Sequence, residues 1–258
     1  MNYENIRYSV SDGVATITID RPRVKNAMSL DTCKEMIDAF RKSDDDPDVR
    51  VMVLTHTGKV FTAGGDLGGY KGKPYMKFRD YALTFKELWT LMPELKKPIV
   101  AVARGNVHGG GIGMISACDM TIAASDVFFQ CSEINIGLFP FMVTPLLIRQ
   151  VGNKKALELM LTGNAIDAEE AKEIGLINHF VAPQEVDGLV KKLTSTLAKK
   201  SPSAMMVGKE TLYNVIDMPY VQALEYTAQM LVLMTFSHDG QEGVNAFLEK
   251  REPDYKGY

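Results

Sequence analysis

The sequence predicts an α/β protein, and three observations carry that prediction. Short β-branched runs alternate with amphipathic segments through the first two thirds of the 258 residues. Two of these runs, 51–54 and 99–102, lead into glycine-rich junctions that are followed by helix-forming sequence. From about residue 183 onward the strand signal ends and helical periodicity takes over. Repeated strand–turn–helix units are typical of an α/β core, to which the C-terminal part adds a helical region.

The strands are predicted from short runs of β-branched and aromatic residues. The first two flank Asp12-Gly13, a dipeptide that favours a tight hairpin turn. The later ones are almost wholly apolar, as is typical of strands buried on both faces. The predicted strands are, in order, 6–10, 14–19, 51–54, 99–102, 120–123 and 127–129.

The helices are predicted from apolar residues that recur three and four positions apart. Ser29 is placed to cap the first helix, and Gly163 to end a later one. Residues 68–74 are rich in glycine and lysine, and we expect a flexible connection there. The last helix carries methionine and leucine on more than one face, so it requires a partner surface. The predicted helices are 29–41, 75–92, 112–118, 146–151, 155–161, 185–200, 204–217 and 220–237.

Composition and charge exclude several classes of function. The chain is 46% hydrophobic and 24% charged with a net charge of -3, so it has no electrostatic attraction to nucleic acid or to an acidic membrane surface. It opens without a signal-like segment, and no apolar run is long enough to span a membrane. Cys33, Cys118 and Cys131 suit neither a metal site nor a disulfide framework. We therefore expect a soluble cytoplasmic protein without a metal.

Two glycine-rich junctions are the most informative feature. Gly109-Gly110-Gly111 separates a strand from an apolar helix, and Gly64-Gly65 follows another apolar run upstream. Backbone N–H groups at the start of a helix lack partners within it and can hold a negative charge. Neither cluster is followed by Gly-Lys-Ser/Thr, which excludes a phosphate loop of the Walker type. One N–H from each junction could instead bind a single carbonyl oxygen.

Three motifs carry a resemblance to a known family. Ala63-Gly64-Gly65-Asp66, His108-Gly109-Gly110-Gly111 and Ser132-Glu133-Ile134-Asn135-Ile136-Gly137 resemble those of the crotonase, or enoyl-CoA hydratase/isomerase, superfamily. Collinear similarities run from Arg21 to Arg251, nearly the whole chain. The resemblance implies a crotonase-like spiral of ββα units over residues 1–195. It also implies that residues 196–258 form a helical region that assembles a homotrimer or a homohexamer.

The resemblance further implies an enzyme acting on an acyl-CoA thioester. Such enzymes stabilise an enolate at the thioester carbonyl with two backbone N–H groups, which map to Gly65 and Gly110. Fixed N–H dipoles lower the barrier, and losing one typically costs about 3–4 kcal/mol. Glu133 maps to the family's acid/base, and its mostly uncharged sequence setting should raise the pKa of its carboxyl. Coenzyme A is part of the substrate, and no other cofactor is implied.

The contacts with coenzyme A follow from the same resemblance. We expect its chain along the backbone of residues 63–67, its adenine near Lys25, and its phosphates near Lys250 of the same or a neighbouring subunit. We expect the acyl group between residues 70–81 and 139–143, and Asp66 as a brace for its loop. The expected binding residues are Lys25, Ala63, Gly64, Asp66, Leu67, Gly109 and Lys250.

One position departs from the family pattern. Hydratases of this family usually carry a second glutamate three residues after the oxyanion glycine, where this chain has Gly113. Hydration requires water activated at C3 and a proton delivered to C2, and two carboxylates share that work more readily than one. A single carboxylate can still move a proton between two carbons, which isomerises a double bond. The departure weakens a hydratase assignment and leaves the acyl-CoA assignment intact.

Several alternatives stay open. A decarboxylase, a lyase or a thioesterase could use the same oxyanion hole, and the chain could be an inactive acyl-CoA-binding scaffold. His108 and His56 are candidate bases and Cys131 is a candidate nucleophile, although packing explains all three. Residues 111–116 approximate a dinucleotide-binding fingerprint with Glu133 roughly 20 residues beyond, but they lie mid-chain rather than in a first βα turn.

Overall fold

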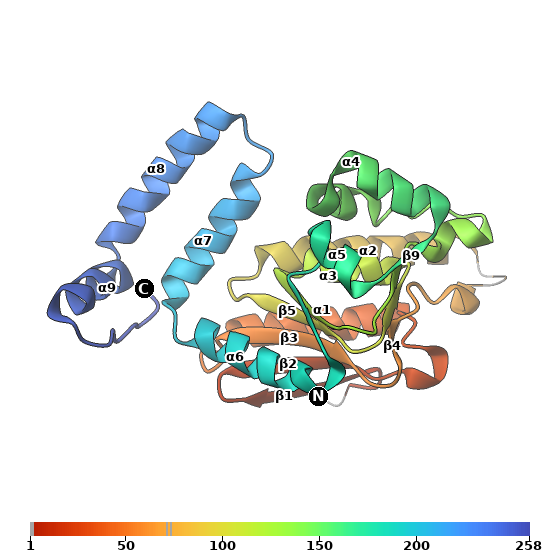
Figure 1. Ribbon diagram of the computed structural model, residues 1–258, viewed down its shortest axis with the longest axis horizontal. Helices are drawn as coiled ribbons and strands as arrows, with labels where there is room; N and C mark the ends of the chain where they lie inside the picture. Colours follow the sequence, from red (N-terminus) through yellow and green to blue (C-terminus); the bar gives the residue numbers. More distant parts are fainter. Residues whose placement is uncertain (1–2, 71, 73) are drawn as a thin grey trace.

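In the computed structural model, which describes residues 3–70, 72 and 74–258, a six-stranded sheet has the order β1-β2-β3-β5-β7-β10 (Figure 1). Its neighbours pair in parallel, except that β1 and β2 form the predicted antiparallel hairpin. Asp12 and Gly13 have φ angles of 52° and 75°, as a tight hairpin turn requires. The strands are β1 (Ile6–Ser11), β2 (Val14–Ile19), β3 (Val51–His56), β5 (Ile99–Ala103), β7 (Met120–Ala124) and β10 (His179–Val181).

A second sheet, of order β4-β6-β8-β9, is made of short strands. Three times in succession a strand of the large sheet is followed by a strand of the small one and then by a helix: β3-β4-α2, β5-β6-α3 and β7-β8-α4. This repeat confirms the predicted spiral of ββα units. The elements are β4 (Val60–Thr62), β6 (Asn106–His108), β8 (Phe129–Gln130), β9 (Ala165–Ile166), α2 (Tyr75–Glu94), α3 (Gly110–Ala117) and α4 (Thr144–Thr162).

The core lies between the large sheet and the helices that cover it. Every residue of β5 is buried, as expected of a central parallel strand. Helix α1 (Leu30–Asp45) buries an apolar face that includes Met36 and Phe40, and each such side chain contributes about 1.5–3 kcal/mol. Ser29 caps α1 by accepting a hydrogen bond from the Thr32 N–H at 3.2 Å, as predicted.

Four helices complete the chain, one more than the sequence predicts. Helix α6 packs against the large sheet, whereas α7, α8 and α9 extend away from it as an arm (Figure 1). Gly240 and Gly243 interrupt the helical pattern of α9, but the Ser237 hydroxyl caps it by accepting from the Gly240 N–H at 3.0 Å. The helices are α6 (Val186–Ala198), α7 (Pro202–Val215), α8 (Tyr220–Phe236) and α9 (His238–Glu249).

Short elements also escape the sequence patterns. β4, β6, β9 and β10 have three residues or fewer, and α5 (Ala168–Glu173) has six. Their stability comes from the elements they pack against, so local sequence carries little signal for them. The predicted flexible connection at 68–74 includes residues 71 and 73, which lie outside the described residues, while Leu67–Tyr70 forms a short 3-10 helix. None of the described helices combines the length and apolar character needed to cross a membrane.

Candidate active site

A cavity of about 440 Å³ opens where the two glycine junctions meet the segment 132–143. Helix α2 forms one wall with mostly aromatic side chains, and residues 136–143 form the facing wall. Its size and mostly apolar lining are typical of a small-molecule site. The lining residues are Ala63, Gly64, Gly65, Leu67, Phe78, Tyr81, Ala82, Phe85, Trp89, Gly109, Gly110, Ser132, Glu133, Ile136, Leu138, Phe139, Pro140, Phe141, Met142 and Val143.

The two junctions meet because β4 and β6 are adjacent parallel strands, whose carboxyl ends lie at the same edge of the sheet. Gly64 has a φ angle of 88°, a conformation that side chains disfavour. A Cβ atom on Gly64 would lie 2.9 Å from the Gly110 nitrogen and 3.2 Å from the His108 carbonyl oxygen. Glycine at position 64 therefore permits the two backbones to approach this closely.

Two backbone N–H groups are left available at this contact. The Gly64 N–H donates to the Thr62 hydroxyl at 3.0 Å, and the Gly109 N–H donates to the Gln130 carbonyl at 2.8 Å. The N–H groups of Gly65 and Gly110 donate to no partner among the described residues. A Cβ atom on Gly110 would lie 3.7 Å from the Gly65 nitrogen, so the two amides are neighbours. The predicted pair of donors is thus brought together beside the cavity.

The first junction is held by a buried asparagine that the sequence reading does not assign to the site. Asn26 has a φ angle of 55°, and its side-chain amide donates to the carbonyls of Thr57 at 2.7 Å and Val60 at 2.8 Å. The backbone carbonyl of Asn26 accepts a hydrogen bond from the Thr62 hydroxyl at 2.7 Å. Because Thr62 in turn accepts from the Gly64 N–H, Asn26 fixes the backbone that leads to Gly65.

Tyr81 supports the same junction from helix α2. Its hydroxyl donates to the Met28 carbonyl at 3.0 Å, and Met28 pairs with Gly65 in an isolated β-bridge. A Cβ atom on Gly65 would lie 2.3 Å from the Tyr81 oxygen, so position 65 has no room for a side chain. Asp66 pairs with Arg21 at 3.2 Å and does not line the cavity, which agrees with its expected role as a brace.

Glu133 places its carboxyl group against the second junction. It lies in a 3-10 helix, Ser132–Ile136, and its Oε2 atom is buried without a hydrogen-bond partner among the described residues. A Cβ atom on Gly109 would lie 3.2 Å from Glu133 Oε1, so Gly109 makes room for this carboxyl. Burial raises the pKa of Glu133 above its ordinary value, because the ionised form loses solvation. This shift agrees with the expectation from the sequence.

The space beside Gly113 is filled by the indole of Trp89. A Cβ atom on Gly113 would lie 2.6, 2.8 and 3.1 Å from three carbons of the six-membered ring. Trp89 is only 5% exposed and lines the cavity from α2. Glu133 is the one acidic side chain in the described lining, which holds no lysine, arginine or histidine.

The alternative bases and the alternative nucleophile have packing roles. His56 is buried; its Nε2 accepts from the Arg104 N–H at 3.0 Å, and burial lowers its pKa. His108 lies 3.2 Å from the Gln130 side-chain oxygen, and burial lowers its pKa as well. Cys131 is 2% exposed, and burial raises the pKa of its thiol to about 12. Among the described residues none of the three lines the cavity.

Two lysines expected to contact coenzyme A lie in different places. Lys25 is exposed at the first junction, and its carbonyl accepts from the Ala63 N–H at 2.9 Å, so it stands at the rim of the cavity. Lys250 ends α9, which lies in the arm far from α2 and α4 (Figure 1). This chain therefore does not bring its own Lys250 to its own cavity.

The glycines of the dinucleotide-like sequence serve packing in α3. A Cβ atom on Gly111 would lie 2.6 Å from the Thr62 methyl group and 3.0 Å from Val107. Neighbouring side chains thus approach Gly111 and Gly113 so closely that neither position has room for a side chain of its own. In the part of the chain that the structure describes, no group of three His, Cys, Asp or Glu side chains is arranged to hold a metal.

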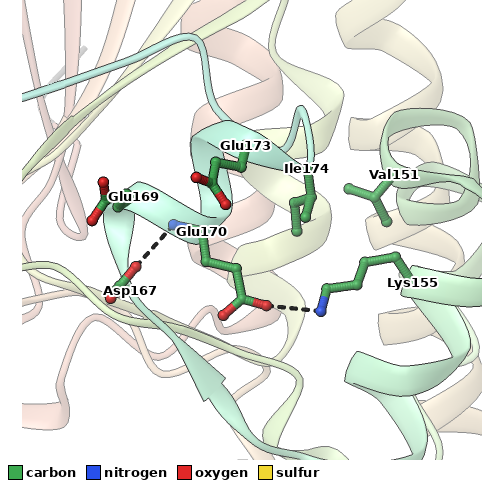
Figure 2. A pocket seen from close by; sticks show the side chains of 7 residues that line it. All are labelled: Val151, Lys155, Asp167, Glu169, Glu170, Glu173 and Ile174. Carbon is green, nitrogen blue, oxygen red and sulfur yellow. Dashed lines mark hydrogen bonds and ion pairs between the residues drawn. The ribbon is translucent and has the colours of Figure 1, made fainter.

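A second hollow of about 580 Å³ lies between α4 and α5 (Figure 2). Its acidic side chains have structural tasks, since Asp167 caps α5 through the Glu170 N–H at 2.9 Å and Glu170 pairs with Lys155 at 2.7 Å. The residues that line it are Val151, Lys155, Asp167, Glu169, Glu170, Glu173 and Ile174.

Comparisons with known proteins find similar sequences and similar structures. The model of the family described as enoyl-CoA hydratase/isomerase matches residues 9–258. A crotonyl-CoA hydratase of Syntrophomonas wolfei is 33% identical over 257 residues, which is 99% of each chain. Crystal structures of enoyl-CoA hydratases from Mycobacterium smegmatis and Bacillus anthracis each match with a TM-score of 0.94 and 30% identity. The match with the Mycobacterium smegmatis structure covers 98% of this chain and 99% of that protein's chain. The match with the Bacillus anthracis structure covers 99% of this chain and 100% of that protein's chain.

Proposed function

This chain belongs to the enoyl-CoA hydratase/isomerase family, and within it we propose a single-glutamate enzyme that isomerises the double bond of an acyl-CoA thioester. The observation that carries the proposal is the composition of the cavity. Two neighbouring N–H groups without partners among the described residues lie beside a site whose described lining has one carboxyl group, that of Glu133. Such a site can stabilise an enolate and can move one proton.

The chemistry follows from these groups. The thioester oxygen accepts hydrogen bonds from the Gly65 and Gly110 N–H groups, and the Glu133 carboxylate removes a proton from C2 of a 3-enoyl thioester. The electron pair spreads over C2 to C4 and onto the oxygen, where the two N–H dipoles stabilise it. Glu133, whose carboxyl proton exchanges with solvent, then delivers a proton to C4, leaving the double bond between C2 and C3. No atom is gained or lost, and a raised carboxyl pKa suits a group that must both accept and donate.

Hydration is the second candidate, because the relative from Syntrophomonas wolfei is named crotonyl-CoA hydratase. The described cavity favours isomerisation over hydration, since it has no second carboxylate to activate a water molecule. It also disfavours decarboxylation of an acyl group with its own carboxylate, because no cationic side chain lines the described cavity to hold that charge. A buried carboxyl oxygen without a hydrogen-bond partner among the described residues, in the same site as two backbone donors, favours an enzyme over an inert scaffold.

The proposal includes binding of coenzyme A and assembly. The coenzyme A chain runs along residues 63–67 past Lys25, and Lys250 from a neighbouring subunit reaches its phosphates. The arm formed by α7 to α9 joins subunits into trimers or hexamers. The free, buried cysteines suit a reducing compartment such as the cytoplasm. Coenzyme A enters with the substrate, and the proposed chemistry uses no other cofactor.

The test compares Glu133→Gln with Glu173→Gln, an exposed glutamate of the second hollow. Glu133→Gln should lower kcat for 3-enoyl-CoA isomerisation by about 10²–10⁴, the usual contribution of a general base, while binding of an acyl-CoA analogue persists. Glu173→Gln should retain the wild-type kcat. Wild-type kcat in Glu133→Gln contradicts the proposal, and binding without turnover in the wild-type protein favours the scaffold.

A further inference from the structure

The contact between Trp89 and α3 lies close to the reacting carbons. Gly113 follows Gly110 by three residues, so it lies about 4.5 Å further along the helix axis. The ring carbons of Trp89 that press on Gly113 are those of the six-membered ring, the far end of the indole. Gly110 and Trp89 line the same cavity, so a thioester whose oxygen binds Gly110 has its acyl chain in a cavity that this ring lines.

Trp89 is held in this position by a stack of aromatic rings on α2. Trp89 packs edge to face on Phe85, with ring centroids 5.2 Å apart and an interplanar angle of 78°. Phe85 packs in the same way on Tyr81, at 4.8 Å and 73°. Because Tyr81 is anchored to the Met28 carbonyl beside Gly65, the stack connects the indole to the oxyanion donors. The stack thus holds the indole in place as part of the cavity wall.

The surroundings of Trp89 are unsuited to a reactive water molecule. A nucleophilic water needs an acceptor to take its proton, and a buried water makes two to four hydrogen bonds, about three on average. The indole Nε1 is buried without a partner among the described residues, but it is a donor only. Apart from Glu133, the described lining offers the hydroxyls of Ser132 and Tyr81, and the latter already donates to Met28.

We propose that Trp89 determines the reaction specificity of this site by filling the volume over Gly113 and excluding water from the reacting carbons. The inference rests on the proposed isomerase function and deepens it. Trp89 makes no proton transfer itself. It keeps water from C3, while Glu133, whose carboxyl exchanges protons with solvent, moves a proton between C2 and C4, so the enolate is quenched by protonation at carbon.

Trp89→Phe is the informative substitution, because phenylalanine keeps an aromatic ring against Phe85 and withdraws the atoms that cover Gly113. Wild type, Trp89→Phe and Leu88→Ala are incubated with 2-enoyl- and 3-enoyl-CoA in water labelled with deuterium and heavy oxygen. Leu88 is buried on the same helix and does not line the described cavity, so it controls for loosening of α2. The measured quantity is the ratio of heavy oxygen incorporated to deuterium exchanged, read by mass spectrometry.

Wild type and Leu88→Ala should exchange deuterium and incorporate little heavy oxygen. Trp89→Phe should raise the ratio about tenfold or more, a typical effect of reshaping an apolar pocket. Trp89→Phe/Gly113→Glu should raise it further, because the vacated space then holds a second carboxylate. If both Trp89 variants fold, exchange deuterium and keep the wild-type ratio, the role of Trp89 is contradicted. Two other results contradict the isomerase proposal itself. One is a wild-type product that carries mainly heavy oxygen, and the other is deuterium exchange in Glu133→Gln at the wild-type level.

Discussion

Glu133 combines two properties that ordinarily oppose each other in a folded protein: its carboxyl is largely buried, and one of its oxygens, Oε2, has no hydrogen-bond partner among the described residues. Its raised pKa means that the native state holds a proton that the unfolded chain releases. The native state therefore binds more protons between pH 4.5, the ordinary value, and its own higher pKa, so stability falls as pH rises through that window. The site is maintained at a cost in stability, as expected for a catalytic group.

Glu133→Gln should consequently stabilise the protein at neutral pH while abolishing activity. The gain is about 1.4 kcal/mol for each unit by which the native pKa exceeds the ordinary one, and it disappears below about pH 4.5. Urea denaturation of both proteins at neutral and at acidic pH measures the difference. Equal free energies of unfolding at neutral pH would mean that the carboxyl is not desolvated.

The same raised pKa should set the acid limb of the activity. Proton removal from C2 requires the carboxylate, so kcat/KM should fall tenfold per pH unit below the pKa of Glu133, with its midpoint above 4.5. A profile of kcat/KM against pH measures it. An unperturbed midpoint near 4.5 contradicts the burial of the group in the free enzyme.

Gly64→Ala should damage the oxyanion site specifically. Its Cβ would lie 2.9 Å from the Gly110 nitrogen, so the two junctions must separate, and kcat should fall about 10²–10³ as for loss of one donor. Gly152→Ala is the control for backbone strain: its φ is also positive, at 75°, which costs about 1–3 kcal/mol with a side chain, and nothing lies within 4 Å of the added carbon. Measuring kcat for both variants separates the effect of backbone strain from the effect of moving the two junctions apart. Equal losses of kcat in the two variants would contradict this prediction.

Residues of the site differ in how far the sequence reveals them. Gly65, Gly110 and Glu133 belong to short linear motifs, so the sequence predicts them and the structure brings them together. Tyr81 and Trp89 do not, because their roles depend on contacts with Met28 and Gly113, distant in the chain. Asn26 is not assigned to the site from the sequence either, because its function as a buried hydrogen-bonding centre depends on contacts formed in the fold.

At the scale of elements, helix α7 is fastened to the core by a buried ion pair. Lys209 Nζ lies 2.8 Å from Asp119 Oδ2 and also donates to the Met92 and Lys97 carbonyls, and its side chain is only 8% exposed. Asp119 additionally accepts hydrogen bonds from the Tyr213 hydroxyl and the Ile99 N–H. This cluster connects α7, the first helix of the arm, to the start of β5 at Ile99 and to α2 at Met92.

Lys209→Met should therefore lower the free energy of unfolding by about 3–5 kcal/mol, because it leaves Asp119 buried with its countercharge removed. Lys155→Met, which breaks the more exposed pair with Glu170, should cost at most about 1 kcal/mol. Chemical denaturation of the two variants gives the comparison. A Lys209 variant as stable as Lys155→Met would show that the buried pair does not hold α7.

Elements follow the same rule of predictability as residues. The hairpin at Asp12-Gly13, the cap at Ser29 and the end of α4 at Gly163 are local signals, and all three are confirmed. The three-residue strands depend on tertiary packing, which local periodicity does not reveal. Helix α9 contains two glycines that obscure its periodicity and begins with the cap at Ser237. The spiral arrangement itself was accessible through the family resemblance and not through periodicity.

At the scale of the whole molecule, the arm carries an apolar surface with no partner in this chain. No residue of α8 is buried, and Leu231 and Phe236 are 69% and 73% exposed. Exposed apolar surface of this extent on one helix is typical of a binding surface, and we propose that neighbouring subunits cover it. We expect the native mass to be that of a trimer or hexamer, and Leu231→Asp/Phe236→Asp to dissociate it. Sedimentation measures both, and a monomeric wild-type protein contradicts the expectation.

The most direct test of the central claim identifies the product. The wild-type protein and Glu133→Gln are each incubated with a 3-enoyl-CoA thioester in deuterium oxide, and the thioesters are analysed by mass spectrometry and NMR. The account predicts migration of the double bond to C2 with deuterium on carbon and no added water in the wild type, and neither change in the variant. Accumulation of a hydrated thioester by the wild type, or undiminished deuterium exchange by Glu133→Gln, would contradict it.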